Sequence, residues 1–167
     1  MDGAMNVSGF WAILQRAHDA SDGDMHKKCG AIRGEIAKLS RDDALEFSRL
    51  FDSMMDKAYS WPVWGAAYLI NGGCGDDTFI DFRASLLSRG HDEFESALAD
   101  PDSLAEKDFD EDVWFYEGYD YAVADAVNAV AASVPIRELP YPETPSGEEW
   151  TEKEVYDLYP RLREKYA

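Results

Sequence analysis

An apolar stripe at helical spacing runs through residues 47–58 and constrains the fold more than any other feature of this chain. Its members lie three or four residues apart or side by side: Phe47, Leu50, Phe51, Met54, Met55 and Ala58. That spacing places them on one face of a helix. Ser40 precedes the stripe as an N-cap, and Asp42 and Asp43 fall in the first turn. No segment keeps the alternation of a strand for long, so the sequence predicts an all-α fold.

Further helices are predicted from the same spacing. We expect a helix of about ten residues behind Ser8 as N-cap, a helix over 25–36 that Gly30 and Gly34 interrupt, and helices over 63–70, 76–88 and 94–98. Asn71-Gly72-Gly73 should end the fourth of these in a left-handed residue. Asp102 is expected to cap a short turn through Leu104. The last long helix is predicted over 111–132, with Gly118 inside it.

A proline-rich segment separates these helices from the end of the chain. Four of the seven prolines fall at positions 135, 140, 142 and 145, and each removes a backbone donor. Thr151 and Glu154 then have the spacing of a capping box, before a final helix broken at Pro160. We therefore predict one compact multi-helix domain over 1–134, a proline-rich extended strap over 135–150, and a C-terminal helix over 151–167 that docks on the core.

The charge of the chain excludes several functions. It carries 34 acidic and 16 basic residues, a formal net charge of −18. Nucleic acids and anionic lipid surfaces are bound largely through Lys and Arg, so we expect no nucleic-acid and no membrane partner. The first residues lack an export signal, and Cys29 and Cys74 are the only cysteines. A reduced, cytoplasmic location is therefore expected.

Most of the excess negative charge falls between residues 92 and 125. This window holds 13 acidic residues and one basic residue, a net charge of −12. Its densest part is an acidic patch formed by Asp108, Asp110, Glu111 and Asp112. The patch either solvates the surface and complements helix N-termini, or attracts a basic partner or a cation. It is not an EF-hand, because Val113 and Tyr119 stand where that loop requires Gly and Glu.

Residues 61–83 form the strongest candidate for a chemical site. The candidate side chains are Trp64, Tyr68, Asp76, Asp77, Asp81 and Arg83. On a helix Asp77 and Asp81 lie one turn apart and share a face. With Glu117 or Asp120 from a facing helix they could hold Mg²⁺ or Mn²⁺, while Arg83 binds an anionic substrate group.

A structural interpretation of the same residues competes with this one. Asp76 and Asp77 would complement the helix N-terminus, and Arg83 would form a partly buried ion pair between two helices. Helical metal sites usually add a Glu-x-x-His motif, and no histidine has that spacing here. The structural interpretation is favoured, and no cofactor is expected.

The chain resembles the family catalogued as domain of unknown function 4240. The residues that carry the resemblance are Phe10-Trp11, Trp64, Ala66-Ala67-Tyr68, Gly72-Gly73, Asp76-Asp77, Phe79, Asp81-Phe82-Arg83, Gly90 and Asp100-Pro101-Asp102-Ser103-Leu104. The resemblance covers roughly residues 8–131. The resemblance implies a small, mostly bacterial, intracellular helical protein and supplies no reaction. Gly75 and Ser85 depart from the family pattern, which would usually place a Ser cap and a large aromatic residue there.

These observations favour a non-enzymatic, acidic helical module that binds a basic protein, such as a regulator or an immunity-type protein. A metal-dependent hydrolase or transferase using Asp77, Asp81 and Arg83 is the first alternative. A nucleic-acid mimic is the second. It is disfavoured because its acids would have to be spaced along one face, whereas the acids around Asp108 are clustered in the chain. The sequence does not define the partner or the oligomeric state.

Overall fold

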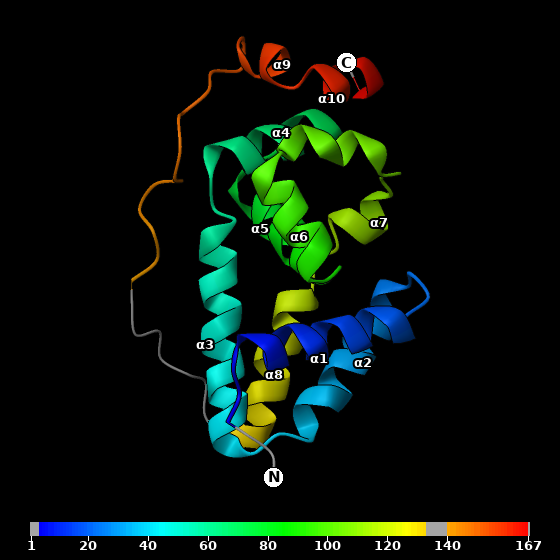
Figure 1. The fold of residues 1–167 in the computed structure, drawn as a ribbon, viewed down its shortest axis with the longest axis vertical. Coiled ribbons are helices and arrows are strands. Elements are labelled where there is room, and N and C mark those ends of the chain that lie inside the picture. The colour runs from blue at the N-terminus through cyan, green and yellow to red at the C-terminus, as the bar shows by residue number, and fades with distance from the viewer. Residues whose placement is uncertain (1–3, 133–139, 167) are drawn as a thin grey trace.

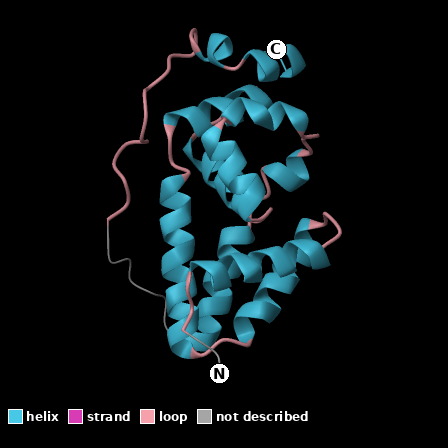
Figure 2. Cartoon of the chain, in the orientation of Figure 1, coloured by secondary structure: helices cyan, strands magenta, loops and turns pink. Residues whose placement is uncertain are grey.

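The computed structural model describes residues 4–132 and 140–166, and every regular element within them is a helix (Figures 1 and 2). The elements are α1 (Val7–Ala20), α2 (Met25–Ala37), α3 (Arg41–Lys57), α4 (Trp61–Asn71), α5 (Asp76–Leu87), α6 (His91–Ala99), the 3-10 helix η1 (Pro101–Glu106), α7 (Glu111–Trp114), α8 (Tyr119–Ala131), α9 (Val155–Leu158) and α10 (Pro160–Tyr166). The predicted all-α, single-domain fold is confirmed.

The helices form two packed groups along the long axis of the molecule (Figure 1). Helix α2 packs along α1 and α8, and α3 packs along α8, at one end. Helices α4, α5, α6, η1 and α7 form the other end, with α9 and α10 lying over α4 and η1. One continuous apolar core joins both groups; fully buried members include Phe10, Leu14, Ile32, Phe47, Phe79, Phe82, Leu86, Phe94 and Val127.

The first two helices differ from their predicted form. Asn6, not Ser8, caps α1, because its side chain accepts a 2.8 Å hydrogen bond from the backbone N–H of Gly9. Helix α2 runs through Gly30 and Gly34 without interruption. Each glycine costs a helix about 1 kcal/mol. Both are exposed, and burial of the opposite face of α2 outweighs that cost.

The next three helices begin and end as predicted to within a residue or two. The Ser40 side chain caps α3 by accepting a hydrogen bond from the N–H of Asp43 at 3.1 Å. Gly72 ends α4 with φ of 67°, in the left-handed region. Helix α5 follows without a side-chain cap, because Gly75 has none to offer. The short helix predicted over 94–98 is longer, since α6 begins at His91.

The prediction of one long helix over 111–132 is wrong, because the chain turns between α7 and α8. Gly118 has φ of 131°, a backbone conformation outside the helical region. The turn lets Trp114 pack its ring on Phe109, with the ring centroids 4.5 Å apart. Tyr119 is fully buried in the core after the turn, with its ring 6.2 Å from that of Phe51.

Residues 140–150 run along one side of the molecule and lead to α9 (Figure 1). An isolated parallel bridge joins Ser146 to Ser60. Thr151 and Glu154 form the predicted reciprocal capping box, with hydrogen bonds of 3.3 and 3.2 Å. The strap residues before Pro140, from 135, lie outside the described residues. None of the described helices is long and apolar enough to cross a membrane.

The role of Asp102 also differs from its prediction. Its carboxylate does not cap its own turn. It instead accepts hydrogen bonds from the backbone N–H groups of Arg161 and Leu162, at 3.2 and 2.9 Å. These are the second and third residues of α10, where helices leave N–H groups unpaired. Asp102 thereby fixes the start of α10 to η1.

Candidate functional site

Trp64 and the turn between α4 and α5 form a packed corner. The indole Nε1 of Trp64 donates a 2.8 Å hydrogen bond to the backbone carbonyl of Cys74. Its ring stacks on that of Phe79, with centroids 4.8 Å apart and planes 14° apart. Trp64 therefore holds the glycine-rich turn against α5.

Arg83 is buried beside this corner, with 8% of its surface exposed. Its guanidinium lies over the rings of Tyr59 and Phe79, at 4.8 and 4.9 Å from their centroids. The Nη1 atom donates a 2.8 Å hydrogen bond to the carbonyl of Met55 at the end of α3. Among the described residues no carboxylate lies within 4.0 Å, so the expected ion pair is absent. Arg83 joins α3 to α5 through a carbonyl and two aromatic faces, and its role as an anion clamp stays a prediction.

Between α5 and the start of α8, three carboxylates lie close enough to Asp81 for their charges to act on it. We call Asp77, Asp81, Glu117 and Asp120 the α5–α8 carboxylate group. Burial, with the charges of Asp120, Glu117 and Asp77, raises the pKa of Asp81 to about 6. Burial also raises the pKa of Asp120, and Glu117 adds to the effect. One carboxylate oxygen of Asp120 is buried without a hydrogen-bond partner among the described residues. The structure thus brings the candidate acids of residues 61–83 and part of the acidic window together.

The same carboxylates do not converge on a metal position. Within residues 4–132 and 140–166, no three His, Cys, Asp or Glu side chains are placed to hold one ion. Like charges that are close without a shared cation raise each other's pKa values, and at Asp81 they add to the larger effect of burial. The arrangement therefore suits a ligand that supplies its own positive charge.

Tyr68 lies away from these acids, beneath the C-terminal segment. Its ring is 5.3 Å from that of Trp150 and 6.5 Å from that of Tyr156. Partial burial and a hydrogen bond to Glu152 raise the pKa of its hydroxyl. Of the six residues predicted in 61–83, Tyr68 is thus the one that α9 and its flanking residues cover.

Asp110 and its neighbours lie on the surface at α7. The Asp110 carboxylate caps α7 by accepting a 2.9 Å hydrogen bond from the N–H of Asp112. Asp108 lies 3.8 Å from the ammonium of Lys165. Glu111 and Asp112 are exposed and form no ion pair with any described residue. Within the acidic patch, Asp110 therefore caps a helix and Asp108 lies near a cation, whereas Glu111 and Asp112 are not neutralised by any described residue.

Distant cations neutralise much of the acidic window. Glu93 pairs with Arg89 and Lys107, at 3.1 and 2.8 Å. The other pairs are Glu95 with Lys57, Glu106 with Arg161, Asp108 with Lys165, Asp125 with Arg33, and Asp92 with the imidazole of His91. The acids of this window without an ion pair among the described residues are Asp100, Asp102, Asp110, Glu111, Asp112, Glu117 and Asp120. Of these, Asp102 is buried and accepts backbone hydrogen bonds. Surface charge left for a partner is therefore concentrated on α7 and the start of α8.

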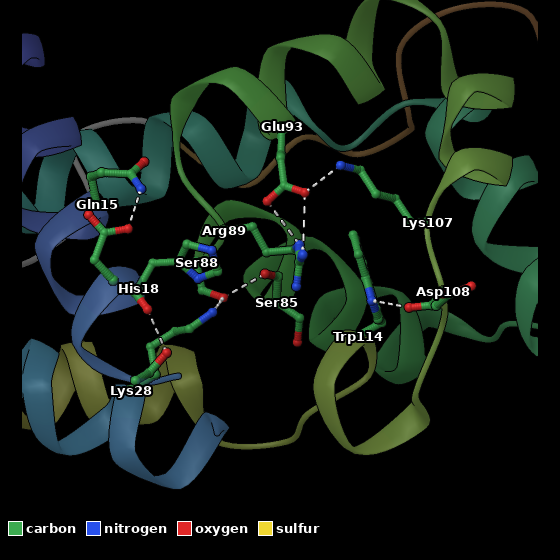
Figure 3. Close-up of polar contacts among 12 residues, drawn as sticks. Gln15, His18, Lys28, Ser85, Ser88, Arg89, Glu93, Lys107, Asp108 and Trp114 are labelled. Carbon is green, nitrogen blue, oxygen red and sulfur yellow. Dashed lines mark hydrogen bonds and ion pairs between the residues drawn. The ribbon is translucent and has the colours of Figure 1, made fainter. Parts of the chain in front are cut away.

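A second polar cluster was not predicted. Lys28 of α2 is 1% exposed and donates a 3.1 Å hydrogen bond to the hydroxyl of Ser88, which in turn donates to the carbonyl of Ser85 at 2.6 Å (Figure 3). Ser85 stands at one of the departures from the family pattern, and its hydroxyl accepts a hydrogen bond from the N–H of Tyr116. A signal for Lys28 was present, since it lies at helical spacing among the buried residues Met25, Ile32 and Ile36.

The fold and these surfaces define a small, acidic, helical protein with one group of carboxylates between α5 and the start of α8. The chain belongs to the family described as protein of unknown function DUF4240, whose sequence model matches residues 5–129. No curated protein and no solved structure matches it. The family match ends before the C-terminal segment that covers Tyr68.

Proposed function

We propose that the protein is a cytoplasmic, non-enzymatic binding module and that its α5–α8 carboxylate group, with the acids of α7, receives a basic protein. The observation that carries the proposal is Asp81, which lies half-buried among three other carboxylates. A Lys or Arg side chain of a partner would lower the pKa of Asp81 and offset the repulsion among these acids. Net charge alone would attract the same partner from a distance and raise the association rate at low salt.

The test compares two charge-matched variants. In one, Asp77, Asp81, Glu117 and Asp120 are changed to Asn, Asn, Gln and Asn. In the control, the exposed residues Asp22, Glu143, Glu148 and Glu149 receive the corresponding amides. Both variants lose the same negative charge, so they differ only in where the charge was removed.

The probe is a fluorescein-labelled oligolysine peptide, whose binding is followed by fluorescence anisotropy at low and high salt. We expect the first variant to lose affinity several-fold more than the control. The Asp81 carboxyl, followed by NMR, should titrate at lower pH when the peptide is bound. Equal losses in the two variants would mean that net charge alone attracts the peptide, and would contradict the proposal.

A metal-dependent hydrolase or transferase is the second candidate, and the proximity of Asp81 to Asp77, Glu117 and Asp120 is the observation that favours it. A divalent cation could draw these carboxylates together on binding. Mn²⁺ or Mg²⁺ should then raise Tm of the wild type and not of Asp77→Asn or Asp81→Asn, because a ligand that binds only the native state stabilises it. An unchanged wild-type Tm removes this candidate and leaves the binding module.

A further inference from the structure

Lys28 carries a positive charge into the interior with one hydrogen-bond acceptor. Its ammonium has three N–H donors. Among the described residues it bonds only to the Ser88 hydroxyl, which donates its own hydrogen to the carbonyl of Ser85. No described carboxylate lies within 4.0 Å of it. Two donors of a fully buried ammonium therefore lack an acceptor.

The side chains around Lys28 add positive charge. Arg89 follows α5, and Lys107 follows η1; both bind the same carboxylate, that of Glu93 on α6 (Figure 3). Two cationic side chains thus share one anionic partner, and Lys28 forms no ion pair with any described carboxylate. The cluster carries an excess of positive charge inside a protein whose net charge is −18.

His18 of α1 lies against the same cluster. Its Nδ1 atom is buried and has no hydrogen-bond partner among the described residues. Burial, with the charges of Lys28 and Arg89, lowers the pKa of His18. Burial and the charge of Arg89 likewise lower the pKa of Lys28 to about 8. Burial is the larger cause for both groups, and the neighbouring positive charges add to it, while the charge of Glu93 acts in the opposite direction.

We propose that Lys28, His18 and Arg89 bind a small inorganic anion, of the size and charge of chloride, between α1, α2 and the end of α5. Lys28 supplies two N–H donors, His18 supplies a third from Nδ1, and Arg89 supplies charge. Ser85 and Ser88 are fully buried at the cluster, and a monatomic or similarly small anion is the class of ligand we assign to this closed position. Buried polar atoms in proteins nearly always have a partner, and an anion would serve these three groups at once. This site is independent of the carboxylates proposed to bind a basic partner.

The first test is thermal unfolding at constant sodium concentration and ionic strength, with gluconate replaced stepwise by chloride or bromide. Because ionic strength is fixed, screening of the acidic surface stays the same. We expect Tm of the wild type to rise with halide concentration and Tm of Lys28→Met not to respond. Lys27→Met is the matched control, because Lys27 is exposed on the same helix and the variant loses the same charge. It should respond as the wild type does.

A second test does not depend on any variant. Crystals of the wild type grown in bromide should show an anomalous peak within hydrogen-bonding distance of Lys28 Nζ. Three outcomes would each overturn the proposal. They are a wild-type Tm that is the same in gluconate and in halide, a Tm of Lys28→Met that still rises with halide, and crystals in bromide without this peak.

Discussion

Asp102 accepts a 2.9 Å hydrogen bond from the backbone N–H of Leu162, sixty residues further along the chain. Leu162 is itself fully buried, so this bond fixes the start of α10 at the point where α10 enters the core. The C-terminal segment lies outside the family match, yet it is attached through a residue inside that match. The attachment should therefore weaken when Asp102 is changed.

Asp102→Asn is expected to loosen α10. An amide has one acceptor oxygen where the carboxylate has two, so one of the N–H groups of Arg161 and Leu162 loses its partner. The negative charge at the helix N-terminus is lost as well. We expect a loss of about 1 kcal/mol and faster amide hydrogen exchange over 146–166. Asp100→Asn is the control, because the exposed Asp100 side chain makes no cap bond; similar exchange in both variants would contradict the capping role.

Gly65→Ala should displace the C-terminal segment from α4. A Cβ atom at Gly65 would lie 2.5 Å from the Tyr159 hydroxyl and 2.9 Å from Nε1 of Trp150. Those two groups donate hydrogen bonds to the carbonyls of Pro62 and Trp61, at 2.5 and 2.6 Å. The variant should therefore lose protection from hydrogen exchange around residues 150 and 159, with a lower Tm.

Gly30→Ala provides the matched control for that substitution. Gly30 is exposed in α2, and a Cβ atom there would meet nothing within 4 Å. The change should raise stability by up to about 1 kcal/mol, because alanine favours a helix. If Gly65→Ala and Gly30→Ala changed Tm and hydrogen exchange in the same way, close packing at Gly65 could not be the cause of the changes in Gly65→Ala.

The fold was predictable where a cap or a stop residue marks an element. Ser40 and Gly72 set the start of α3 and the end of α4 through local geometry. The break at Gly118 was not predictable in this way, because apolar spacing continues from Tyr116 through Tyr119. Gly118 adopts φ of 131° because of how the chain on either side of it packs, and this packing is visible only in the structure.

The candidate site was predictable only in part, for a different physical reason. Spacing placed Asp77 and Asp81 on one face of a helix, and the structure sets Asp120 close enough to raise the pKa of Asp81. Charge counted along the chain could not show that Arg161 pairs with Glu106 or Lys165 lies near Asp108. Ion pairs between distant residues follow from tertiary packing, which local patterns do not encode.

Asp81→Asn should stabilise the protein above pH 6. The folded-state pKa of Asp81, about 6, exceeds its ordinary value of 3.8, so the folded state holds this proton more tightly. Its contribution to stability falls as pH rises from 3.8 to 6, and the full penalty is present above pH 6. The variant removes the penalty, with an expected gain of about 1 kcal/mol after allowance for solvent screening.

Urea denaturation at pH values from 4 to 8 measures this difference. The curves for Asp81→Asn and the wild type should converge near pH 4 and separate toward neutral pH. Asp22→Asn removes the same charge from an exposed turn, at φ of 49°, which asparagine also adopts. A gain of the same size in both variants would assign the effect to net charge and not to the carboxylate group.

Lys28→Met tests the buried ammonium through the pH dependence of stability, in gluconate buffer to avoid halide binding. The pKa of Lys28 is about 8 in the folded protein and 10.5 ordinarily, with burial as the main cause. Below pH 8 both states carry the proton, and the folded state bears the full penalty. Between pH 8 and 10.5 the folded state loses the proton first, so wild-type stability rises with pH relative to the variant.

Lys28→Met removes the cost of burying the charged ammonium, which is on the order of 3 kcal/mol. The variant also loses the hydrogen bond to Ser88, which offsets about 1 kcal/mol of that gain. The variant should therefore unfold at higher urea than the wild type at pH 7, and the advantage should shrink by pH 10. Lys27→Met, exposed on the same helix, should follow the wild-type curve. If the free energy of unfolding of Lys28→Met and that of the wild type changed with pH in parallel, the charge of Lys28 would have no cost in the folded state. We expect a cost because the Lys28 side chain is only 1% exposed.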